Sequence, residues 1–359
     1  VASPGAGNGR APYRADARNS PSHAMRVSQA RTTTCGPFLR RAATVCSKTM
    51  TASVQFESPP CPLCGHSTYQ HLIRNGRDLI WRKPGRFNVQ RCTHCDLVAT
   101  RPRPTTESLG LYYEETYSGE SNDGMKRFQT ESGIGRWISK YRLSAIARVR
   151  PLNAEDHVLD VGCSYGGFLE MARTTTRCQT SGLDADAGSI ADAVSPKEID
   201  YQIGFLETAD YGAETFSVVT FFESLEHHSD PISALRKAHR LLRADGLCVV
   251  EVPNFAGFWR RIFGRFWLPL LLPQHLFHFT PKTLSKAMTA AGFKPAHHQT
   301  MFYPLEGVAS LGLALGTLLR SPPPGAPFSW RTPFDILVFF ALAILYPLIE
   351  VPSQAILRA

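Results

Sequence analysis

A short apolar run in the middle of the chain is followed by glycines whose spacing suits a ligand-binding turn. Residues 158–161 are mostly apolar and partly β-branched, which is typical of a buried parallel strand. Gly162 and Gly166 let the backbone turn sharply and approach a ligand closely. The helix expected from about residue 167 to 173 then offers free N–H groups to an anion. The order fits neither Gly-x-Gly-x-x-Gly nor a Gly-Lys-Ser/Thr phosphate loop, and the alternative is an ordinary strand–loop–helix corner.

A carboxylate also ends the next predicted strand. Residues 181–184 form a short strand that closes with Asp184, 24 residues after Asp160. A carboxylate at that position can accept hydrogen bonds from both hydroxyls of a ribose, as in nucleotide-binding α/β sheets. The alternative is a surface aspartate that caps the following helix, and Asp186 is the better candidate for that cap.

Three further strands complete an alternating pattern of strands and helices. The clearest spans residues 217–222, the next spans 247–252, and a weak one spans 201–203. A helix with apolar residues at helical spacing covers residues 232–242. Strands and helices that alternate at these lengths predict a doubly wound parallel sheet, which binds ligands at the carboxyl ends of its strands.

Two Cys-x2-Cys pairs precede this sheet. Cys61 and Cys64 form the first pair, and Cys92 and Cys95 form the second. Paired knuckles of this kind supply four thiolates to a tetrahedral structural zinc, which has no open position for catalysis. Two disulfides or redox-active thiols are the alternatives, although redox pairs rarely occur twice in one chain.

The strand and its glycine loop resemble motif I of the class I S-adenosylmethionine-dependent methyltransferases. Asp160, Gly162 and Gly166 match the family pattern Asp/Glu-x-Gly-x-Gly-x-Gly, and Ser164 replaces its middle glycine. The resemblance implies S-adenosylmethionine as cofactor, with its methionine part held by the loop. It also implies that Asp160 orients the loop or pairs with the cofactor amine, and that Asp184 fixes the ribose.

The same resemblance assigns roles to two later loops. It places Phe205 and Leu206, after the third strand, beside the adenine ring; the alternative is that both are ordinary core residues. Residues 223–231, after the fourth strand, resemble the family's Leu-Glu-His…Asp-Pro segment, which faces both the cofactor and the acceptor.

A zinc module followed by a tyrosine-bearing linker and this core resembles the bacterial sugar C-methyltransferases. The resemblance covers roughly residues 58–300, with the tyrosines in residues 111–117. It implies that Glu226 and His227 serve as an acid/base pair. Histidine suits proton removal near neutral pH, whereas the alternative for His227 is a purely structural role.

Residues 273–281 also resemble these enzymes and precede a helix that Thr280 is expected to cap. His275 and His278 are candidates for the acceptor side, and the alternative is that they anchor a lid. Residues 255–272 are rich in Phe, Trp, Leu and Arg. They form either a lid that excludes water or a surface for a membrane or an apolar acceptor.

The net charge of +9 in 359 residues is concentrated at the N-terminus. Residues 1–55 hold seven arginines, one lysine and one aspartate, so the rest is nearly neutral and no nucleic-acid partner is expected. This tail is polar and without apolar periodicity, which predicts disorder, and it lacks the apolar region of a secretory signal. Two explanations of this tail stay open. It is a transit peptide, or the start of the chain is misassigned and Met25 or Met50 is the true first residue. The nine cysteines suggest no disulfide framework, which favours a cytoplasmic location.

Two apolar runs follow the core, at residues 307–319 and 336–349. Both are shorter than the roughly 20 residues of a membrane-spanning helix, so they predict buried helices or a hairpin with peripheral membrane contact. Residues 293–301 predict a sixth strand. The family normally adds a seventh, antiparallel strand, but none is expected in the last residues, which leaves truncation open.

Together these features predict an α/β protein with a doubly wound, Rossmann-like methyltransferase sheet. Methyl transfer to a small sugar-like or hydroxylated acceptor is the expected function, with His227 and Glu226 as the acid/base pair. An O-methyltransferase of a quinone-like or lipid acceptor is the first alternative. A catalytically silent zinc-ribbon and Rossmann binding protein is the second. The expected divisions are a disordered basic tail (1–57), a zinc-ribbon-like module (58–104), a helical linker (105–150), the cofactor-binding core (151–303) and an apolar helical C-terminal extension (304–359).

Overall fold

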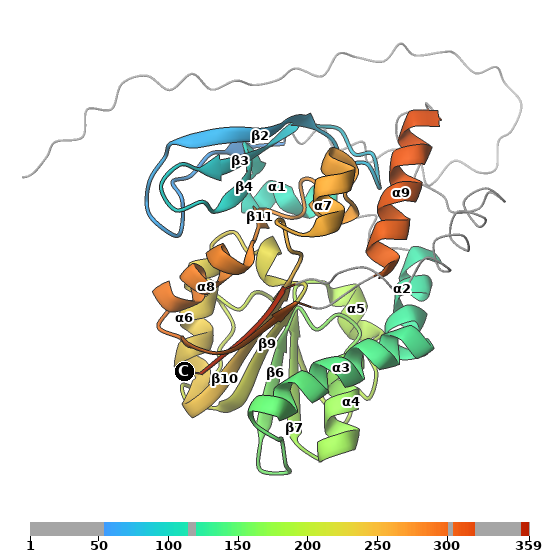
Figure 1. The fold of residues 1–359 in the computed structure, drawn as a ribbon. Coiled ribbons are helices and arrows are strands. Elements are labelled where there is room, and N and C mark those ends of the chain that lie inside the picture. The colour runs from blue at the N-terminus through green and yellow to red at the C-terminus, as the bar shows by residue number, and fades with distance from the viewer. Residues whose placement is uncertain (1–53, 114–119, 301–303, 320–352, 359) are drawn as a thin grey trace, which may run out of the picture. The chain divides into compact units, whose positions relative to one another are not determined.

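The computed structural model describes residues 54–113, 120–300, 304–319 and 353–358, which lie in one compact unit, Ser53–Ala359 (Figure 1). Its centre is a seven-stranded sheet with the order β12-β13-β10-β9-β6-β7-β8. The five strands from β10 to β8 in this order are mutually parallel, which confirms the predicted parallel sheet. Their bounds are β6 (His157–Val161), β7 (Gln179–Asp184), β8 (Asp200–Ile203), β9 (Phe216–Phe222) and β10 (Leu242–Val252).

Helices cover both faces of the parallel strands, which explains why the strands are apolar without alternation (Figure 1). On β9, Val218 belongs to the core cluster of one face, and Val219 and Phe221 belong to the cluster of the other. The first face is covered by α3 (Gly133–Val149), α4 (Gly167–Thr176) and α5 (Ala187–Ala191). The second face is covered by α6 (Pro231–Leu241) and α8 (Pro281–Ala290).

Side-chain caps set the starts of the helices that follow the strands. The Asp186 carboxylate accepts a hydrogen bond from the Ser189 amide at 2.6 Å, which confirms the predicted cap of α5. The Thr280 hydroxyl accepts from the Thr283 amide at 3.2 Å within a capping box, which confirms the predicted cap of α8.

The last strand of the sheet corrects the expectation of a C-terminal extension without a strand. β13 (Ser353–Arg358) lies between β10 and β12 (Lys294–Thr300) and runs antiparallel to both. Its six residues carry no turn signal or alternation, so the pairing on both edges, a long-range contact, decides their conformation. The predicted sixth strand is β12, and α9 (Pro304–Leu319) is the helix predicted at residues 307–319.

The second apolar run, at residues 336–349, lies outside the described residues, so its membrane contact stays a prediction. Among the helices that the structure describes, none has both the length and the apolar character needed to cross a bilayer.

A second, antiparallel sheet carries the cysteines. Its strands are β2 (Tyr69–Gly76), β3 (Phe87–Cys92), β4 (Val98–Arg101) and β11 (Phe277–His278). β11 comes from far along the chain and pairs with β4, so the cysteine module and the core share backbone hydrogen bonds. β1 (Phe56–Glu57) pairs with β5 (Arg103–Pro104), and regular structure therefore begins just before the expected boundary at residue 58.

Short helices connect the module, the core and α9. Three lie in the predicted helical linker: α1 (Thr106–Leu109), η1 (Gly110–Tyr112) and α2 (Glu120–Thr130). One follows β9: η2 (Leu225–His227). Three more lie between β10 and β11: α7 (Phe258–Phe263), η3 (Gly264–Phe266) and η4 (Leu268–Leu270).

A buried ion pair fastens α3 to the carboxyl end of β10. Arg142 donates from Nε to the Glu251 carboxylate at 3.1 Å, and a terminal guanidinium nitrogen contacts the same oxygen. Glu251 is fully buried, and the Arg142 guanidinium also lies 4.4 Å from the centroid of the Phe222 ring. The charge on Glu251 therefore depends on Arg142 for compensation.

We expect Arg142→Ala to lower the free energy of unfolding by about 3–5 kcal/mol, because it removes the ion-pair partner of a buried carboxylate. Urea denaturation measures this loss. Arg173→Ala is the matched control, since Arg173 pairs with Glu170 on the half-exposed surface of α4, and its loss should cost about 1 kcal/mol or less. Equal losses in the two variants would contradict a buried, compensated charge at Glu251.

Candidate functional site

The loop between β6 and α4 is held in an unusual left-handed conformation. Gly162, Ser164 and Gly166 have φ angles of 79°, 49° and 78°. Glycine adopts such angles without strain, which explains why the motif prefers it, and Ser164 adopts one at a cost. Gly166 is the N-cap of α4, so the loop and the first free N–H groups of the helix lie together at the carboxyl end of β6.

The two glycines are also required by packing against neighbouring strands. A Cβ atom on Gly166 would lie 1.8 Å from the Tyr201 hydroxyl oxygen, and one on Gly162 would lie 2.5 Å from Cβ of Ser224. Neither distance is compatible with a side chain. The loop therefore packs against Tyr201 on β8 and against Ser224, which follows β9, and these contacts fix its path before any ligand binds.

Asp184 ties the end of β7 to this loop. Its carboxylate accepts hydrogen bonds from the amide of Ser164 at 2.8 Å and from that of Asp186 at 2.9 Å. A carboxylate has about four lone-pair sites, so these contacts leave capacity to accept a ribose hydroxyl. Asp160, at the end of β6, instead accepts a hydrogen bond from the Thr220 hydroxyl at 2.6 Å, and burial raises the pKa of Asp160 to about 7.

The two predicted adenine contacts, which lie in the segment after β8, differ in exposure. Phe205 is 55% exposed, so its ring is accessible for stacking, whereas Leu206 is completely buried in the core. A carboxylate, left-handed backbone amides and an accessible aromatic ring thus lie at the ends of neighbouring strands. These groups fit a nucleoside that carries a charged amino-acid part, which is the chemistry of S-adenosylmethionine. The individual residue roles stay predictions.

His227 lies at the end of η2, on the predicted acceptor side. Its Nδ1 is 3.1 Å from the backbone carbonyl oxygen of Gln274 and 2.8 Å from the hydroxyl oxygen of Tyr113. A carbonyl can only accept, so the tautomer with a proton on Nδ1 satisfies Gln274 and leaves the Nε2 lone pair to accept a proton. Burial lowers the pKa of His227 to about 4, so the imidazole is neutral at pH 7.

Glu226, one residue earlier, has the opposite protonation preference. It is 1% exposed, and within the described residues neither carboxylate oxygen has a hydrogen-bond partner. Burial raises the pKa of Glu226 to about 8, so its side chain is mainly protonated at pH 7. Nε2 of His275 lies 3.9 Å from Oε1 of Glu226.

The two histidines of the later loop have different neighbours. His275 hydrogen-bonds through Nδ1 to the carbonyl oxygen of Pro269 at 2.8 Å, which leaves Nε2 toward Glu226. His278 lies 3.1 Å from the Thr100 hydroxyl through Nε2, so it joins the core to β4. Ligand atoms of Glu226, His227 and His275 all lie within 4.8 Å of one another, so these three residues could also hold a divalent cation.

The four predicted zinc ligands come together in the N-terminal module. The sulfur atoms of Cys61 and Cys95 lie 3.5 Å apart, as do those of Cys64 and Cys92, and all four lie within 4.8 Å of one another. A tetrahedral zinc with Zn–S bonds of about 2.3 Å would space its sulfurs by roughly 3.8 Å. The cysteines are not joined as disulfides, so the cluster fits a structural zinc.

Several residues of the site were not identified from the sequence. Tyr113 was noted only as part of a tyrosine-rich linker, and Gln274 and Thr220 were not singled out. Their contacts span 47 to 114 residues of sequence, to His227 and to Asp160. A local sequence pattern does not indicate contacts between residues so far apart in the chain. One such residue could have been inferred from the sequence. The hydroxyl of Thr220 is suited to bind the buried carboxylate of Asp160 at the end of the neighbouring strand.

The comparisons with known proteins agree with this site. The methyltransferase-domain family model matches residues 134–298. A ubiquinone biosynthesis O-methyltransferase of Aromatoleum aromaticum is 30% identical over 188 residues, which cover 49% of this chain and 80% of the relative. The chain belongs to the class I S-adenosylmethionine-dependent methyltransferases.

Two further comparisons give the extent of the similarity. The enzyme of the same name from Ruegeria sp. (strain TM1040) is 32% identical over 149 residues, which are 38% of this chain and only 60% of that relative. Among solved structures, an S-adenosylmethionine-dependent methyltransferase from Archaeoglobus fulgidus aligns with a TM-score of 0.44 and 16% identity. That alignment covers 66% of this chain and 99% of the other.

We expect the wild-type chain to contain one zinc ion by elemental analysis. The double variant Cys61→Ser and Cys64→Ser should lose it, because two hydroxyls replace two of the four thiolates. Cys178→Ser is the control, since Cys178 is buried elsewhere, at the start of β7, and its loss should leave the metal content unchanged. An unchanged zinc content in the double variant would remove the assignment.

Glu226 should make stability fall with rising pH. Its pKa is raised to about 8 in the folded chain, so the folded state retains a proton that the unfolded state releases above about pH 4.5. The stabilisation is full below pH 4.5 and is lost as the pH rises to 8. Glu226→Gln stays neutral, so relative to wild type it should gain on the order of 4 kcal/mol between pH 5 and pH 8.5. Urea denaturation at both pH values tests this, with Glu170→Gln as control; a gain independent of pH would contradict it.

Proposed function

We propose that this chain transfers a methyl group from S-adenosylmethionine to a hydroxyl oxygen of a small-molecule acceptor, with His227 as general base. The observation that carries this proposal is the place of the His227 ring, whose Nδ1 lies 3.1 Å from the carbonyl oxygen of Gln274 and 2.8 Å from the Tyr113 hydroxyl, so that Nε2 is left for the acceptor. The family membership of the chain supplies the cofactor class.

The residues at the strand ends bind and orient in this proposal. S-adenosylmethionine, when bound, supplies an electrophilic methyl group on a sulfonium. The amides of the 162–166 loop and the N-terminus of α4 hold the carboxylate of its methionine part. Asp184 accepts the ribose hydroxyls with the lone pairs that its backbone contacts leave unused, and Phe205 stacks on the adenine.

In this proposal, residues on the acceptor side carry out the proton transfer. Nε2 of His227 would take the proton of the acceptor hydroxyl as its oxygen is methylated, and bound S-adenosylmethionine would supply the methyl group while its sulfur keeps the electrons of the C–S bond. Glu226 is neutral at pH 7, so its carboxyl proton can donate a hydrogen bond to the acceptor. Alignment of the two reactants supplies much of the rate, and general-base help adds about 10²–10⁴-fold.

The names of the relatives favour oxygen as the methylated atom. Both curated relatives described above are ubiquinone biosynthesis O-methyltransferases, which supports a quinone-like hydroxylated ring as acceptor. A sugar-like acceptor methylated on carbon is the second candidate. It is favoured by the four-cysteine module that precedes the core, together with the adjacent Glu226 and His227.

We expect titration calorimetry to show micromolar binding of S-adenosylmethionine by the wild-type chain and at least tenfold weaker binding by Asp184→Ala. The substitution removes the acceptor for the ribose hydroxyls and a tie to the 162–166 loop. Asp186→Ala is the control, since it removes a helix cap but no proposed cofactor contact. Absence of binding by the wild-type chain would favour a catalytically silent protein instead.

For His227→Ala we expect cofactor binding within twofold of wild type and a 10²–10⁴-fold loss of methyl transfer. The measurement uses cofactor with a radiolabelled methyl group and a panel of catechols and nucleotide sugars. His228→Ala is the control, because the adjacent His228 side chain pairs with Glu207 rather than with the acceptor side. A normal transfer rate in His227→Ala would eliminate this residue as the base.

A further inference from the structure

Three contacts fix His275, a residue to which the proposed methyl transfer gives no role. Its amide donates to the carbonyl oxygen of Leu271 at 2.9 Å, and its own carbonyl oxygen accepts a hydrogen bond from the Thr100 hydroxyl at 2.8 Å. Its ring bonds through Nδ1 to the carbonyl oxygen of Pro269 at 2.8 Å. The backbone and the ring of His275 are therefore both held, so the ring has one defined orientation on the acceptor side.

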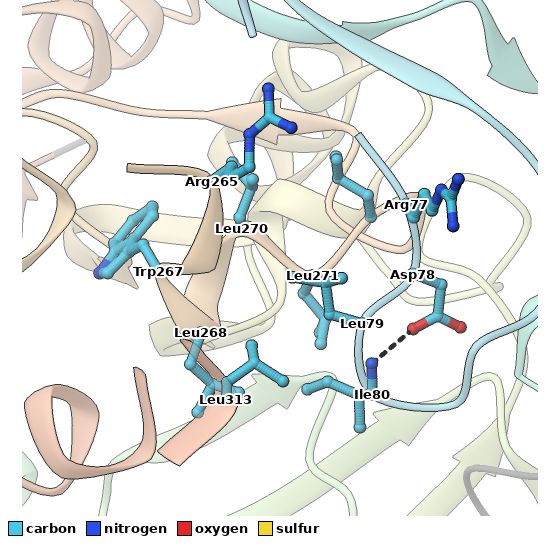
Figure 2. Close-up of a pocket in the computed structure, with 11 residues that line it drawn as sticks. Arg77, Asp78, Leu79, Ile80, Arg265, Trp267, Leu268, Leu270, Leu271 and Leu313 are labelled. Atoms are coloured by element: carbon cyan, nitrogen blue, oxygen red, sulfur yellow. Dashed lines mark hydrogen bonds between the residues drawn. The ribbon is translucent and has the colours of Figure 1, made fainter. Parts of the chain in front are cut away.

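The stretch that holds His275 is itself closely packed. Side chains from the loop after β2, from the stretch before β11 and from α9 surround a hollow with room for only about one water molecule (Figure 2). Asp78 fixes the loop after β2 by accepting a hydrogen bond from the amide of Ile80 at 2.9 Å, which Figure 2 shows as a dashed line. The amide of Leu268 donates to the Ser310 hydroxyl at 2.9 Å, which joins the stretch to α9. Close packing of this kind leaves the stretch little freedom to move, so it supports His275 firmly.

The bond to Pro269 decides which ring nitrogen of His275 carries a proton. A carbonyl oxygen can only accept, so Nδ1 is the donor, and in a neutral imidazole Nε2 is then an acceptor. His275 is only 5% exposed, and burial disfavours the charged form of a histidine. Nε2 therefore offers one lone pair and needs a hydrogen-bond donor.

The carboxyl group of Glu226 is the donor that lies beside this nitrogen. Its Oε1 is 3.9 Å from Nε2 of His275, and both of its oxygens are buried without a hydrogen-bond partner in the part of the chain that the structure describes. An N···O hydrogen bond is about 2.7–3.2 Å long, so a small rotation of the flexible glutamate side chain closes the gap. The amide of Leu276 donates to the carbonyl oxygen of Glu226 at 2.9 Å, which keeps the two residues together. Because an unsatisfied buried polar group is costly, the bond is favoured whenever Glu226 carries its proton.

The ring of His275 also contacts the other member of the acid/base pair. Its centroid lies 4.5 Å from that of the His227 ring, and the two ring planes cross at 83°, so the edge of one ring packs against the face of the other. The carbonyl oxygen of the preceding residue, Gln274, lies 3.1 Å from Nδ1 of His227. Two consecutive residues thus hold the orientation of His227, and one of them reaches Glu226 as well.

We propose that His275 is a positioning residue for the acid/base pair: its Nε2 accepts a hydrogen bond from the carboxyl O–H of Glu226, and its ring holds that of His227. No proton is transferred between His275 and Glu226. The bond directs the carboxyl group of Glu226 in the empty site, and an arriving acceptor hydroxyl then competes with Nε2 for the same O–H. This inference rests on the proposed function, because it concerns the residues that would move the proton.

The first experiment detects the contact without a reaction, by nitrogen NMR of the full chain with isotope-labelled histidine rings. The resonances that His275→Gln removes are those of His275. We expect a proton on Nδ1, none on Nε2, and a downfield shift of the Nε2 resonance in Glu226→Met, which keeps the side-chain volume but removes the donor. Glu207→Met is the control, since Glu207 pairs with His228 and should leave His275 unchanged. A proton on Nε2, or an Nε2 resonance that Glu226→Met does not move, overturns the proposal.

The second experiment separates the two ring nitrogens by kinetics. An asparagine amide nitrogen lies near the position of Nδ1, and a glutamine amide oxygen lies near that of Nε2. His275→Asn therefore retains the bond to Pro269, and His275→Gln retains the acceptor for Glu226. We expect His275→Asn to lower kcat for methyl transfer to catechol at least tenfold, and His275→Gln to recover most of this loss. S-adenosylmethionine should bind both variants within twofold of wild type, which also shows that they are folded. His239→Asn is the control, because His239 packs against Phe293 at the end of α6.

The outcomes separate this inference from the proposed function. An equal loss in His275→Asn and His275→Gln, no loss in either, or a larger loss in His275→Gln overturns the positioning role of Nε2. A metal ion that elemental analysis finds in wild type and that His275→Gln releases also overturns it, since Nε2 would then bind a cation. A wild-type chain that methylates no acceptor contradicts the proposed function alone, because the nitrogen spectra still decide the contact.

Discussion

The acceptor side of this protein depends on a short set of hydrogen bonds between β4 and the loop that leads into β11. The Thr100 hydroxyl donates to the carbonyl oxygen of His275 at 2.8 Å, and its amide donates to that of Leu276 at 2.9 Å. The amide of Leu276 in turn donates to the carbonyl oxygen of Glu226 at 2.9 Å. These three hydrogen bonds, two of them from the buried Thr100, connect the cysteine module, the later loop and η2, and they help to set the positions of Glu226 and His275.

Burial sets the protonation states in this site. Glu223, Glu226 and Glu251 all lie near the carboxyl ends of β9 and β10, and Arg142 pairs directly with Glu251. Burial is the main cause that raises the pKa of Glu223, and the neighbouring carboxyl groups of Glu226 and Glu251 add to it. Glu226 and His227 are then both neutral at pH 7, one as an acid and the other as a base. Adjacent groups whose pKa values are pushed apart in this way are a recurring arrangement for proton transfer.

The sequence predicted the parts of this structure that depend on local pattern. The parallel strands followed from apolar runs, the cap at Asp186 followed from its position before a helix, and the cysteine cluster followed from its spacing. The start of β10 was less well placed, because the strand was predicted from residue 247 and already begins at Leu242, although the Asp-Gly pair at residues 245–246 is typical of a turn. Its pairing with β9 shifts register between Leu242 and Leu247, which accommodates the turn residues within the strand.

The missed parts depend on contacts that are distant in sequence. β13 becomes a strand because β10 and β12 offer it two edges, and β11 becomes one because β4 does. Tyr113 reaches His227 across 114 residues. A pattern of residue types carries no information on such partners, because each side chain is equally compatible with a surface position. Sequence reasoning therefore predicted the strands of the parallel sheet better than the contacts around His227.

These contacts indicate a structural role for the cysteine module. Gly65 and Asp96 each follow the second cysteine of a knuckle with a left-handed φ, and each amide donates to the first cysteine's carbonyl oxygen. Two matching turns thus bring the end of β3 and the chain before β2 to one point, where a metal would fix them. The same strands carry Thr100, through β4, and the loop with Leu79 and Ile80. A metal bound to four thiolates would have no open position, so its role would be to hold these strands in place.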